Sequence, residues 1–564
     1  MKRSESPRNM SLGESSSDPF PRRGRFGSGV TVAFHFFSQL PPVALAKESP
    51  VTYAFRLSLP LCLPSCSFSP IIMIKLSVMQ GGIPMLTKPL LEAMKAYRED
   101  HVYPLHTPGH KGGRGADEDL KDLLGENALL SDVSLMEELD DIHHPEGAIK
   151  DAETLAATLY GADRCFFGVN GTTGVIHGML LGALRPGDKI LVPRNSHKSV
   201  LGGLILGGLE PISLAPCYDE SWRMTLQITP EQVDAALNKK PDIKAVFLTT
   251  PNYFGLAADT EKIARICHEK GVLLLVDEAH GPHLGFSSLL PKSAMQCGAD
   301  AAAQSTHKIV GAMTQCSLLQ VSYDRIDKDA MERAMSLVTT TSPNYLLMGS
   351  LDAARFQLAQ KGTAMAKASL RAAALLREEL KKIDGLPVLT DELIGKGGVA
   401  AMDPGKVTIM TSALGLTGPE AAEILRREKI AVELVDEDHV LFLVTYADDH
   451  AEFAQKAVLI RETLEKSRKP VRNVAPAAVL SKIPERRLLP RDAFFAPHER
   501  VPFDESAGRV TTESISFYPP GIPLIMPGEV ITEELIAYAR LMQEKKLLVS
   551  GPQDPSLREI EVIK

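Results

Sequence analysis

Two charged residues come directly after apolar segments, at positions where they could act on a carbonyl compound. Asp277 follows the apolar run Val272–Val276, and Lys308 follows the strand-like segment Asp300–Gln304, 31 residues further along the chain. A lysine is normally solvated, and burial at the end of a strand lowers its pKa and makes it a nucleophile for Schiff-base formation. A carboxylate such as Asp277 can pair with the nitrogen of a heterocyclic ring. Each residue also has a simpler interpretation: Lys308 as a surface lysine in a loop, and Asp277 as the cap of the next turn.

A segment rich in glycine and threonine could bind an anion. Asn170–Gly174 has the sequence Asn-Gly-Thr-Thr-Gly and stands immediately before the helical pattern Val175–Leu184. Its glycines allow the backbone to approach a ligand, the helix start offers free N–H groups, and the hydroxyl groups of Thr172 and Thr173 can donate hydrogen bonds. The segment is not a P-loop, because the chain has no G-x-x-x-x-G-K-[ST] sequence. Taken alone, it could be an ordinary helix cap.

Two histidines and a serine complete this group of residues. His197 follows an apolar segment that ends near Pro193, and its flat ring could stack on a planar ligand. Ser305 and His307 stand just before Lys308. A phosphate-binding turn, a stacking ring, a carboxylate and a lysine therefore occur in this order along the chain. Together they are the parts needed to bind pyridoxal phosphate through a Schiff base.

The segment Asp277–His280, with the sequence DEAH, allows two other interpretations that the rest of the sequence disfavours. A helicase with this motif would need a P-loop, which is absent, and a basic surface, whereas the chain carries a net charge of −8. A metal site could use His280 and His283, but no third ligand is evident. The seven cysteines form no C-x-x-C pair, which argues against a zinc ribbon and against a disulfide framework.

A parallel sheet is expected to position these residues. From about residue 85, helical patterns alternate with short, continuously apolar segments, which are typical of strands buried on both faces. Ligands bind at the carboxyl ends of such strands, where the groups above are expected. The expected helices are Leu86–Tyr97, Ile149–Tyr160, Val175–Leu184, Thr260–Lys270, Tyr345–Ile383 and Gly418–Glu428, and the expected strands are Arg164–Phe167, Lys189–Val192, Ala245–Leu248, Val272–Val276, Asp300–Gln304, Val407–Thr411 and Val440–Thr445.

Length and composition limit what the protein can be. The 564 residues are 44% hydrophobic and 23% charged, which is typical of globular domains. No apolar run approaches the roughly 20 residues of a membrane span. The negative net charge disfavours nucleic acid and suits a cationic partner. We therefore expect a small basic molecule as the ligand, no nucleic-acid or membrane partner, and a location in the cytoplasm, which is a reducing compartment.

Several segments resemble the signature blocks of the Orn/Lys/Arg decarboxylase family in their order and spacing. The C-terminal sequence Tyr518–Pro523, followed by Pro527-Gly528-Glu529, resembles the closing motif of that family. The similarity extends from about residue 85 to Lys564, and the chain looks most like the short bacterial arginine decarboxylases. The other blocks are His106–Lys111, Asn170–Gly174, Pro193–Ser199, Asp277–His280, Ser305–Lys308 and Thr339–Tyr345.

This resemblance implies pyridoxal 5'-phosphate as the cofactor and assigns roles around its ring. Lys308 would hold the cofactor covalently and later help to reprotonate the substrate carbon. Asp277 would pair with the ring nitrogen and keep it protonated. His197 would stack on the ring, and His280 would lie near the oxygen of the ring.

The resemblance also assigns residues to the phosphate and to the substrate. Thr172, Thr173 and Ser305 would bind the phosphate together with backbone N–H groups. His307 would flank both the phosphate and the reactive lysine. Glu529 would accept the distal cation of the substrate, although the C-terminal segment could instead brace a second subunit.

The implied fold is α/β, with a cofactor-binding domain of the aspartate-aminotransferase type built on a large, mostly parallel sheet. That major domain is expected at residues 81–345, a smaller α/β domain at 346–470, and an α+β C-terminal decarboxylase domain at 471–564, with a linker near 466–476. In this fold the active site usually lies at a dimer interface. We therefore expect a homodimer or a higher homo-oligomer, in which Thr339–Pro343 is a candidate to reach the neighbour's phosphate.

The first 80 residues differ from the rest of the chain. They carry nine Lys and Arg against four Asp and Glu, which leaves a charge of −13 for the remainder, and they show no helical or strand period. We expect a disordered or mispredicted extension, with Met73, Met79 or Met85 as alternative starts. A basic cluster at Arg22–Arg25 and the sequence Ala44-Leu45-Ala46 imitate a secretory signal, which stays an alternative.

The expected function is decarboxylation of a basic amino acid, most simply arginine to agmatine and CO2 in polyamine biosynthesis. Lysine, giving cadaverine, and ornithine remain alternative substrates. Another enzyme that uses pyridoxal phosphate, an aminotransferase or a β-eliminating lyase, is a further alternative. An aminotransferase would be expected to clamp the substrate carboxylate with an arginine, and no site for one stands out between Val407 and Thr445. A non-catalytic regulator is disfavoured because Lys308, Asp277 and His197 are all present.

Overall fold

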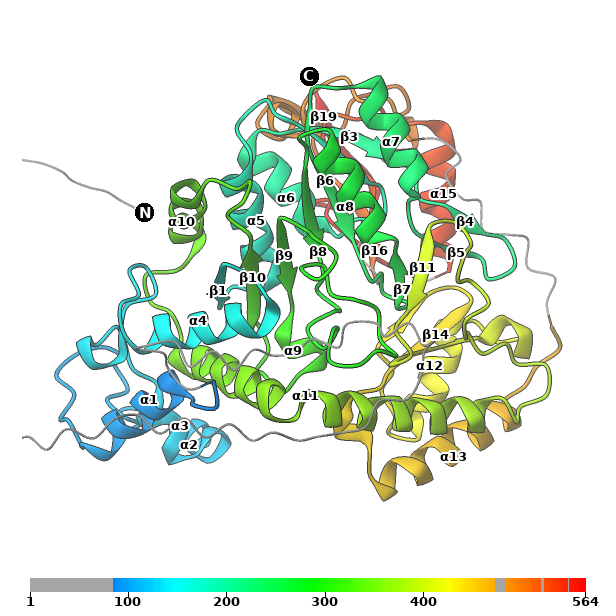
Figure 1. The fold of residues 1–564 in the computed structure, drawn as a ribbon. Coiled ribbons are helices and arrows are strands. Elements are labelled where there is room, and N and C mark those ends of the chain that lie inside the picture. The colour runs from blue at the N-terminus through cyan, green and yellow to red at the C-terminus, as the bar shows by residue number, and fades with distance from the viewer. Residues whose placement is uncertain (1–84, 472–482, 519–521, 546) are drawn as a thin grey trace, which may run out of the picture. The chain divides into compact units, whose positions relative to one another are not determined.

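A seven-stranded sheet forms the centre of the structure, a computed structural model that describes residues 85–471, 483–518, 522–545 and 547–564. Its strands are β1 (Arg164–Gly168), β2 (Lys189–Pro193), β3 (Glu210–Leu214), β6 (Ile243–Thr249), β8 (Leu273–Asp277), β9 (Ala301–Gln304) and β10 (Ser317–Val321). Their order across the sheet is β1-β10-β9-β8-β6-β2-β3 (Figure 1). Pairing is parallel from β9 to β3, whereas β10 pairs antiparallel with both β9 and β1. The mostly parallel sheet of the prediction is confirmed, with β10 reversed.

Both faces of this sheet are buried, and consecutive residues of one strand point into different cores. In β1, Phe166 packs in the core beside β2 and β6, whereas Phe167 packs in the core on the opposite face. In β8, Leu275 packs in the same core as Phe166, and Val276 packs in a core on the opposite face. Because each position of a strand buried on both faces needs an apolar side chain, β8 has the continuously apolar sequence from which it was predicted.

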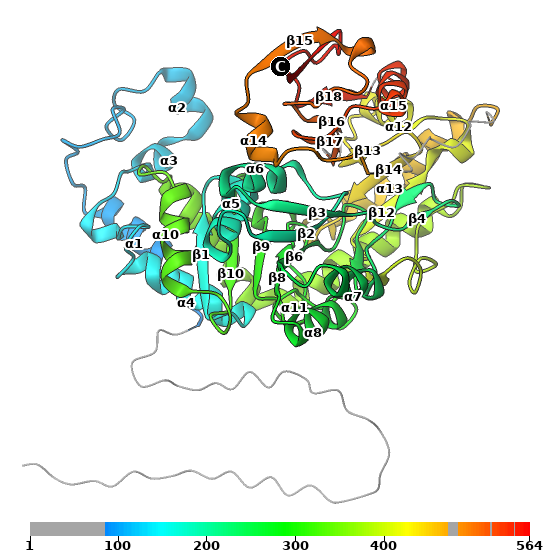
Figure 2. The ribbon, with the colours of Figure 1, turned by 90° about the horizontal axis from the view of Figure 1, so that it is seen from above.

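Helices cover the two faces of the sheet (Figures 1 and 2). One face carries α5 (Gly171–Ala183), α6 (Lys198–Gly207) and α10 (Lys328–Val338), and the other carries α4 (Ala148–Tyr160), α7 (Pro230–Lys239) and α8 (Thr260–Glu269). Helices α5 and α10 approach closely because Gly178 and Gly182 leave room for the side chains of Met335 and Met331. A β-carbon at either glycine would collide with the methionine sulfur.

One long helix, α11 (Tyr345–Leu380), connects the large sheet to a second sheet. Its first half packs against α1 (Pro89–Glu99) and α4, and its second half packs against the second sheet. Because one helix contributes to both cores, the two sheets are held together. The strands of the second sheet are, in order, β12 (Lys406–Met410), β14 (His439–Leu443) and β13 (Leu434–Val435), and the helices nearby in sequence are α12 (Gly418–Arg427) and α13 (Ala451–Lys466). Two further pairs of short strands are β7 (Leu256–Ala258) with β11 (Val399–Met402) and β4 (Tyr218–Asp219) with β5 (Met224–Thr225).

The C-terminal segment, residues 483–564 where described, packs next to α6 (Figure 2). Its own core includes Phe503, Ile525 and Leu535. Its elements are α14 (Pro490–Phe494), β15 (His498–Pro502), β16 (Ile515–Tyr518), β17 (Ile522–Ile525), α15 (Glu533–Glu544), β18 (Leu548–Ser550) and β19 (Glu559–Ile563). The mixture of helices and small antiparallel sheets agrees with the predicted α+β character.

Three helix starts differ from the prediction, that of α4 by one residue, because it begins at Ala148 rather than Ile149. Helix α1 begins at Pro89 rather than Leu86, because proline fits the first helical position, where its missing N–H is not needed. Helix α5 begins at Gly171 rather than Val175, so the glycine- and threonine-rich segment forms the first helical turn instead of preceding it. Two short N-terminal helices, α2 (Glu118–Leu124) and α3 (Glu126–Ser131), were not predicted.

The predicted domain boundaries at residues 345/346 and 470/471 stay predictions, because Val78–Lys564 form one compact unit. The predicted extension 1–80, residues 472–476 of the predicted linker and Pro519–Gly521 of the closing motif lie outside the described residues. Within the described part of the chain, no helix is both long and apolar enough to cross a membrane.

Candidate active site

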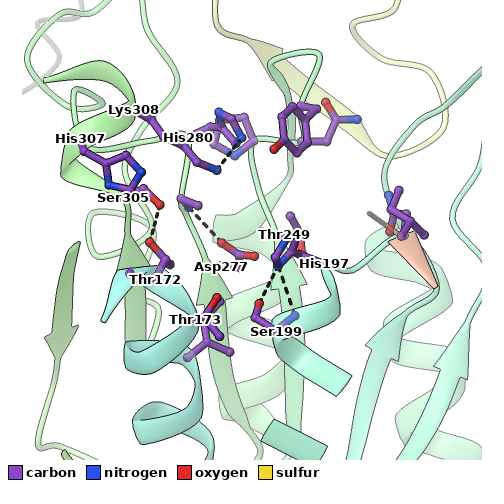
Figure 3. A pocket seen from close by; sticks show the side chains of 18 of the residues that line it. Thr172, Thr173, His197, Ser199, Thr249, Asp277, His280, Ser305, His307 and Lys308 are labelled. Carbon is purple, nitrogen blue, oxygen red and sulfur yellow. Dashed lines mark hydrogen bonds between the residues drawn. The ribbon is translucent and has the colours of Figure 1, made fainter. Parts of the chain in front are cut away.

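A cavity of about 360 Å³ lies where several parallel strands end (Figure 3). This is the position at which ligands bind in parallel sheets. Eight of the nine predicted site residues line it, and Glu529 does not. The eight are Thr172, Thr173, His197, Asp277, His280, Ser305, His307 and Lys308. Figure 3 shows their side chains converging on one space from separate strand ends and from the start of α5.

The start of α5 is arranged to bind an anion. The side chain of Asn170, the residue before the helix, makes no capping hydrogen bond, and within the described residues the N–H groups of Thr172 and Thr173 have no acceptor. The hydroxyl of Thr172 is hydrogen-bonded to that of Ser305 across the cavity. A helix start with free N–H groups and two nearby hydroxyls fits a phosphate group. Gly171 has a φ of +68°, which favours glycine at this turn.

Asp277 and Thr249 present polar groups to the cavity from the ends of β8 and β6. One carboxylate oxygen of Asp277 accepts a hydrogen bond from the N–H of Ala279 at 3.0 Å, and no described residue donates to the other oxygen. Burial raises the pKa of Asp277, against the attraction of Lys308. The buried hydroxyl of Thr249 also has no hydrogen-bond partner among the described residues. A ligand with a cationic ring nitrogen would supply what Asp277 lacks.

His197 is held as a neutral, flat ring at the start of α6. Its Nδ1 accepts a hydrogen bond from the N–H of Ser199 at 3.2 Å and lies 2.9 Å from the hydroxyl of Ser199. Burial is the largest cause that lowers the pKa of His197, to about 4. The imidazole is therefore uncharged at neutral pH, with its proton on Nε2, and its orientation is fixed.

Lys308 lies in the short helix α9 (Thr306–Ile309), just after β9. Its Nζ is 3.2 Å from Nε2 of His280 and lies 5.4 Å from the centre of the Tyr253 ring. Burial lowers the pKa of Lys308, although the carboxylate of Asp277 opposes this. The side chain therefore has the partly desolvated environment that makes a lysine nucleophilic. Nearby, Nδ1 of His307 lies 2.9 Å from the carbonyl oxygen of Cys316, which holds that ring at the cavity wall.

Glu529 lies outside the cavity and is already paired. Its carboxylate accepts two hydrogen bonds from the guanidinium of Arg194, at 2.6 and 3.2 Å, and a third from the N–H of Met526 at 2.8 Å. Only 1% of its side chain is exposed. The expected contact between Glu529 and a substrate cation therefore finds no support in this geometry. The ion pair instead joins the C-terminal segment to the turn that ends with His197.

Sequence analysis missed Lys406, which lies behind the cavity wall. The Nζ of Lys406 is 2.7 Å from Nδ1 of His280, and the residue is completely buried. Its position at the start of an apolar strand, after Gly405, was a usable signal, but the predicted strand began one residue later at Val407. The alternative metal site is also unsupported, because the described residues contain no group of three or more metal-ligating side chains around His280 or elsewhere.

Known proteins are similar to this chain over most of its length. Residues 88–452 match the family described as Orn/Lys/Arg decarboxylase, major domain, and residues 475–551 match the C-terminal domain of the same family. The arginine decarboxylase of Halalkalibacterium halodurans is 40% identical over 478 residues, which cover 84% of this chain and 97% of that protein. The arginine decarboxylase of Bacillus subtilis is also 40% identical, over 84% of this chain and 98% of its own length.

Solved structures show the same fold. The lysine decarboxylase LdcF of Francisella novicida matches with a TM-score of 0.74 over 85% of this chain and 81% of its own, at 24% sequence identity. At that identity the likeness supports the fold alone. The match to the major-domain family covers more than half of the chain, and the relatives at 40% identity cover most of it. This chain therefore belongs to the Orn/Lys/Arg decarboxylase family.

Proposed function

We propose that this chain is a pyridoxal-phosphate-dependent decarboxylase that converts L-arginine to agmatine and CO2. The observation that carries the proposal is one cavity that combines a helix start fitted to a phosphate, a buried carboxylate, a fixed imidazole ring and a desolvated lysine. The choice of arginine is supported by relatives at 40% identity that are arginine decarboxylases.

The residues of the cavity match the parts of pyridoxal phosphate. Thr172, Thr173 and Ser305 would bind the phosphate at the start of α5, where N–H groups are free. The open oxygen of Asp277 would pair with the ring nitrogen. His197, whose ring is fixed by Ser199, would lie against the ring face.

When bound, pyridoxal phosphate supplies a ring that accepts the electron pair left behind by CO2. Asp277 would stabilise positive charge on the ring nitrogen, since a buried carboxylate acts strongly at short range. Lys308 would bind the aldehyde carbon of the cofactor through Nζ. After CO2 leaves, a proton must reach the substrate carbon, and Nζ of Lys308, which lies beside Nε2 of His280, would deliver it.

The composition of the cavity wall favours decarboxylation over transamination. Within the described residues, no arginine lines the cavity. An aminotransferase would neutralise the substrate carboxylate with an arginine, whereas a decarboxylase gains from leaving that carboxylate unpaired, because an ion pair made in the ground state opposes the loss of CO2. The absence of such a clamp from the described wall therefore supports the decarboxylase proposal.

We expect kcat/KM to be at least about tenfold higher for arginine than for lysine or ornithine. A guanidinium is a planar fork that makes paired hydrogen bonds, whereas an ammonium is a compact and more strongly hydrated charge. A site built for the fork leaves buried groups unpaired when it receives a lysine. Steady-state rates for the three amino acids under one condition, with the released amine identified, test this expectation. A tenfold preference for lysine would reject the substrate, and release of a keto acid would reject decarboxylation.

Replacing Glu529 with glutamine is expected to destabilise the protein and to change KM for arginine less than about threefold. The change leaves the buried guanidinium of Arg194 without its anion, at a cost of about 3–5 kcal/mol. A substrate anchor would behave differently, raising KM by about 100-fold at unchanged stability. Thermal unfolding and KM measured on the same preparations distinguish the two. The matched control is Glu485→Gln, which removes an exposed pair with Arg487 and should alter neither quantity.

Two further expectations remain part of the proposal. A homo-oligomer is supported by exposed apolar side chains in the N-terminal region, where Leu105 is 87% and Leu123 is 78% exposed and α2 buries none of its residues. A cytoplasmic location is supported by the cysteines of the described residues, which are free thiols in this structure, as in reducing compartments.

A further inference from the structure

The imidazole ring of His280 lies between two lysine side chains. Its Nε2 is 3.2 Å from Nζ of Lys308, a contact drawn in Figure 3, and its Nδ1 is 2.7 Å from Nζ of Lys406. Lys308 belongs to α9 and lines the cavity, whereas Lys406 begins β12 in the second sheet and lies behind the cavity wall. His280 therefore links a buried lysine of the second sheet to the candidate reactive lysine.

The hydrogen-bonding capacity of imidazole limits the charge of this trio. A neutral imidazole has one N–H group and one nitrogen lone pair, so it cannot accept hydrogen bonds from two ammonium groups at once. His280 is neutral, because burial and then the positive charge of Lys406 hold its pKa well below the usual range. The lysine that faces the protonated ring nitrogen must therefore accept through the lone pair of a neutral amine. At most one of the two lysines is an ammonium.

The geometry identifies Lys406 as the ammonium. Its contact with His280 is the shorter of the two, as expected for a charge-assisted hydrogen bond. Burial lowers the pKa of Lys406, and the negative charges of Asp403 and Glu433 oppose this change. Burial opposes the ionisation of Asp403. Its pKa is nevertheless lowered, because its carboxylate lies 3.2 Å from Nε2 of His283 and accepts a hydrogen bond from the N–H of Gly405.

Lys308 is then the neutral partner. Burial lowers the pKa of Lys308, while the negative charges of Asp277 and Glu433 oppose this change. The lone pair of its Nζ faces Nε2 of His280, which carries the ring proton when Nδ1 accepts from Lys406. The titratable groups that surround the three side chains are Asp277, Glu433, Asp403, His197, His283 and Tyr253.

We propose that Lys406 is a positioning residue, which donates a hydrogen bond to Nδ1 of His280, fixes the ring proton on Nε2, and so keeps Lys308 as a neutral amine. The inference rests on the pyridoxal phosphate site proposed above. A neutral amine is the form of lysine that attacks an aldehyde. Its lone pair forms the C–N bond, and the carbonyl oxygen leaves as water together with the two amine hydrogens. A lysine outside the cavity therefore sets the reactivity of the lysine inside it.

The test measures how fast the full chain, freed of cofactor by dialysis, forms a C=N bond with added pyridoxal phosphate. Absorbance follows the reaction from about pH 6 to about pH 9, and the pH at half-maximal rate reports the pKa of Lys308. In Lys406→Met, Nε2 of His280 becomes free to accept from a Lys308 ammonium, so this midpoint is expected to rise by about one unit or more. At a pH below both midpoints the rate then falls about tenfold or more, because the neutral fraction falls in proportion. The control is Lys367→Met, an exposed lysine of α11, which should match the wild type.

A second comparison separates the hydrogen bond from a simple effect of charge. If Lys406 acts through the His280 ring, Lys406→Met shifts the midpoint in the wild type and not in a His280→Phe background. An equal shift in both backgrounds, or no shift in either, overturns the proposal. Lys406→Gln is measured alongside, in case the methionine variant does not fold, because its amide can still donate to Nδ1 without the charge. For Lys406→Gln, a midpoint close to that of the wild type supports the proposal, and a shift of about one pH unit overturns it.

The same experiment distinguishes this inference from the proposed function. If the wild-type chain forms no C=N bond, or if reduction and peptide mapping place that bond on a lysine other than Lys308, the proposed cofactor site is wrong. If Lys308 of the wild type reacts and the Lys406 variants react with the same pH dependence, the cofactor site stands and the positioning role fails.

Discussion

Lys308→Ala is expected to lower kcat by at least about 10³-fold and to abolish the yellow colour of the protein with bound cofactor. Within the described residues, Lys308 is the lysine that lines the cavity. In the proposed function its Nζ would both bind the cofactor and return a proton to the substrate carbon. Alanine removes both roles at once. Cofactor still binds, more weakly, because the phosphate site at the start of α5 is intact. The measurements are kcat by release of CO2, the absorbance spectrum, and cofactor affinity by quenching of protein fluorescence.

The matched control for this prediction is Lys198→Ala. Lys198 is exposed, stands next to His197 in sequence and does not line the cavity, so its removal should leave kcat within about threefold of the wild type. Lys308→Arg tests whether charge alone is sufficient, and it should be as inactive as the alanine variant, since a guanidinium is not a nucleophile at neutral pH. Borohydride reduction that labels a lysine other than Lys308 would contradict the assignment.

The sequence allowed the cavity to be predicted because one physical rule places most of its residues. In a parallel sheet the carboxyl ends of the strands meet at one edge, so polar residues that follow apolar runs are brought together. Asp277 at the end of β8, Lys308 after β9 and His197 after β2 all follow this rule, and all three line the cavity. The continuous apolar character of β8, which results from burial on both faces, made the strand visible in the sequence.

The pairs that join distant parts of the chain could not be predicted in this way. Lys406 and His280 are 126 residues apart, and Arg194 and Glu529 are 335 residues apart. Periodicity describes one element at a time and contains no information on which charge pairs with which. The family resemblance assigns Glu529 to a substrate cation, whereas in the structure an arginine of the protein itself pairs with its carboxylate.

Strand β10 was not among the predicted strands, and its direction was also beyond the sequence pattern. Ser317–Val321 is fully buried and pairs antiparallel with both of its neighbours. A buried strand is apolar in either direction, because burial depends on the faces of the sheet and not on the polarity of the chain. The prediction of a mostly parallel sheet was therefore based on the strands that alternate with helices. It could not identify β10 as the reversed strand.

Asp277→Asn is expected to lower kcat by about 10²–10³-fold, or about 2.7–4 kcal/mol of transition-state stabilisation. Asp277 is 3% exposed, and its open oxygen faces the cavity without a donor among the described residues. An amide cannot keep a ring nitrogen protonated, so the ring becomes a weaker acceptor for the electron pair left by CO2. The phosphate site and Lys308 are untouched, and cofactor affinity should therefore fall much less than kcat.

The adjacent residue provides the matched control. Glu278 is buried at the same strand end, but its carboxyl group accepts hydrogen bonds from the N–H of Ala294 and the amide of Gln304, both at 2.6 Å, and does not line the cavity. Burial raises the pKa of Glu278 to about 8. In glutamine the amide nitrogen would face one of these two donors, so Glu278→Gln is expected to cost stability while leaving the cavity wall unchanged. Glu278→Gln should retain kcat within about threefold, whereas Asp277→Asn should not. Equal and nearly normal kcat values in the two variants would show that the charge of Asp277 plays no part in the reaction.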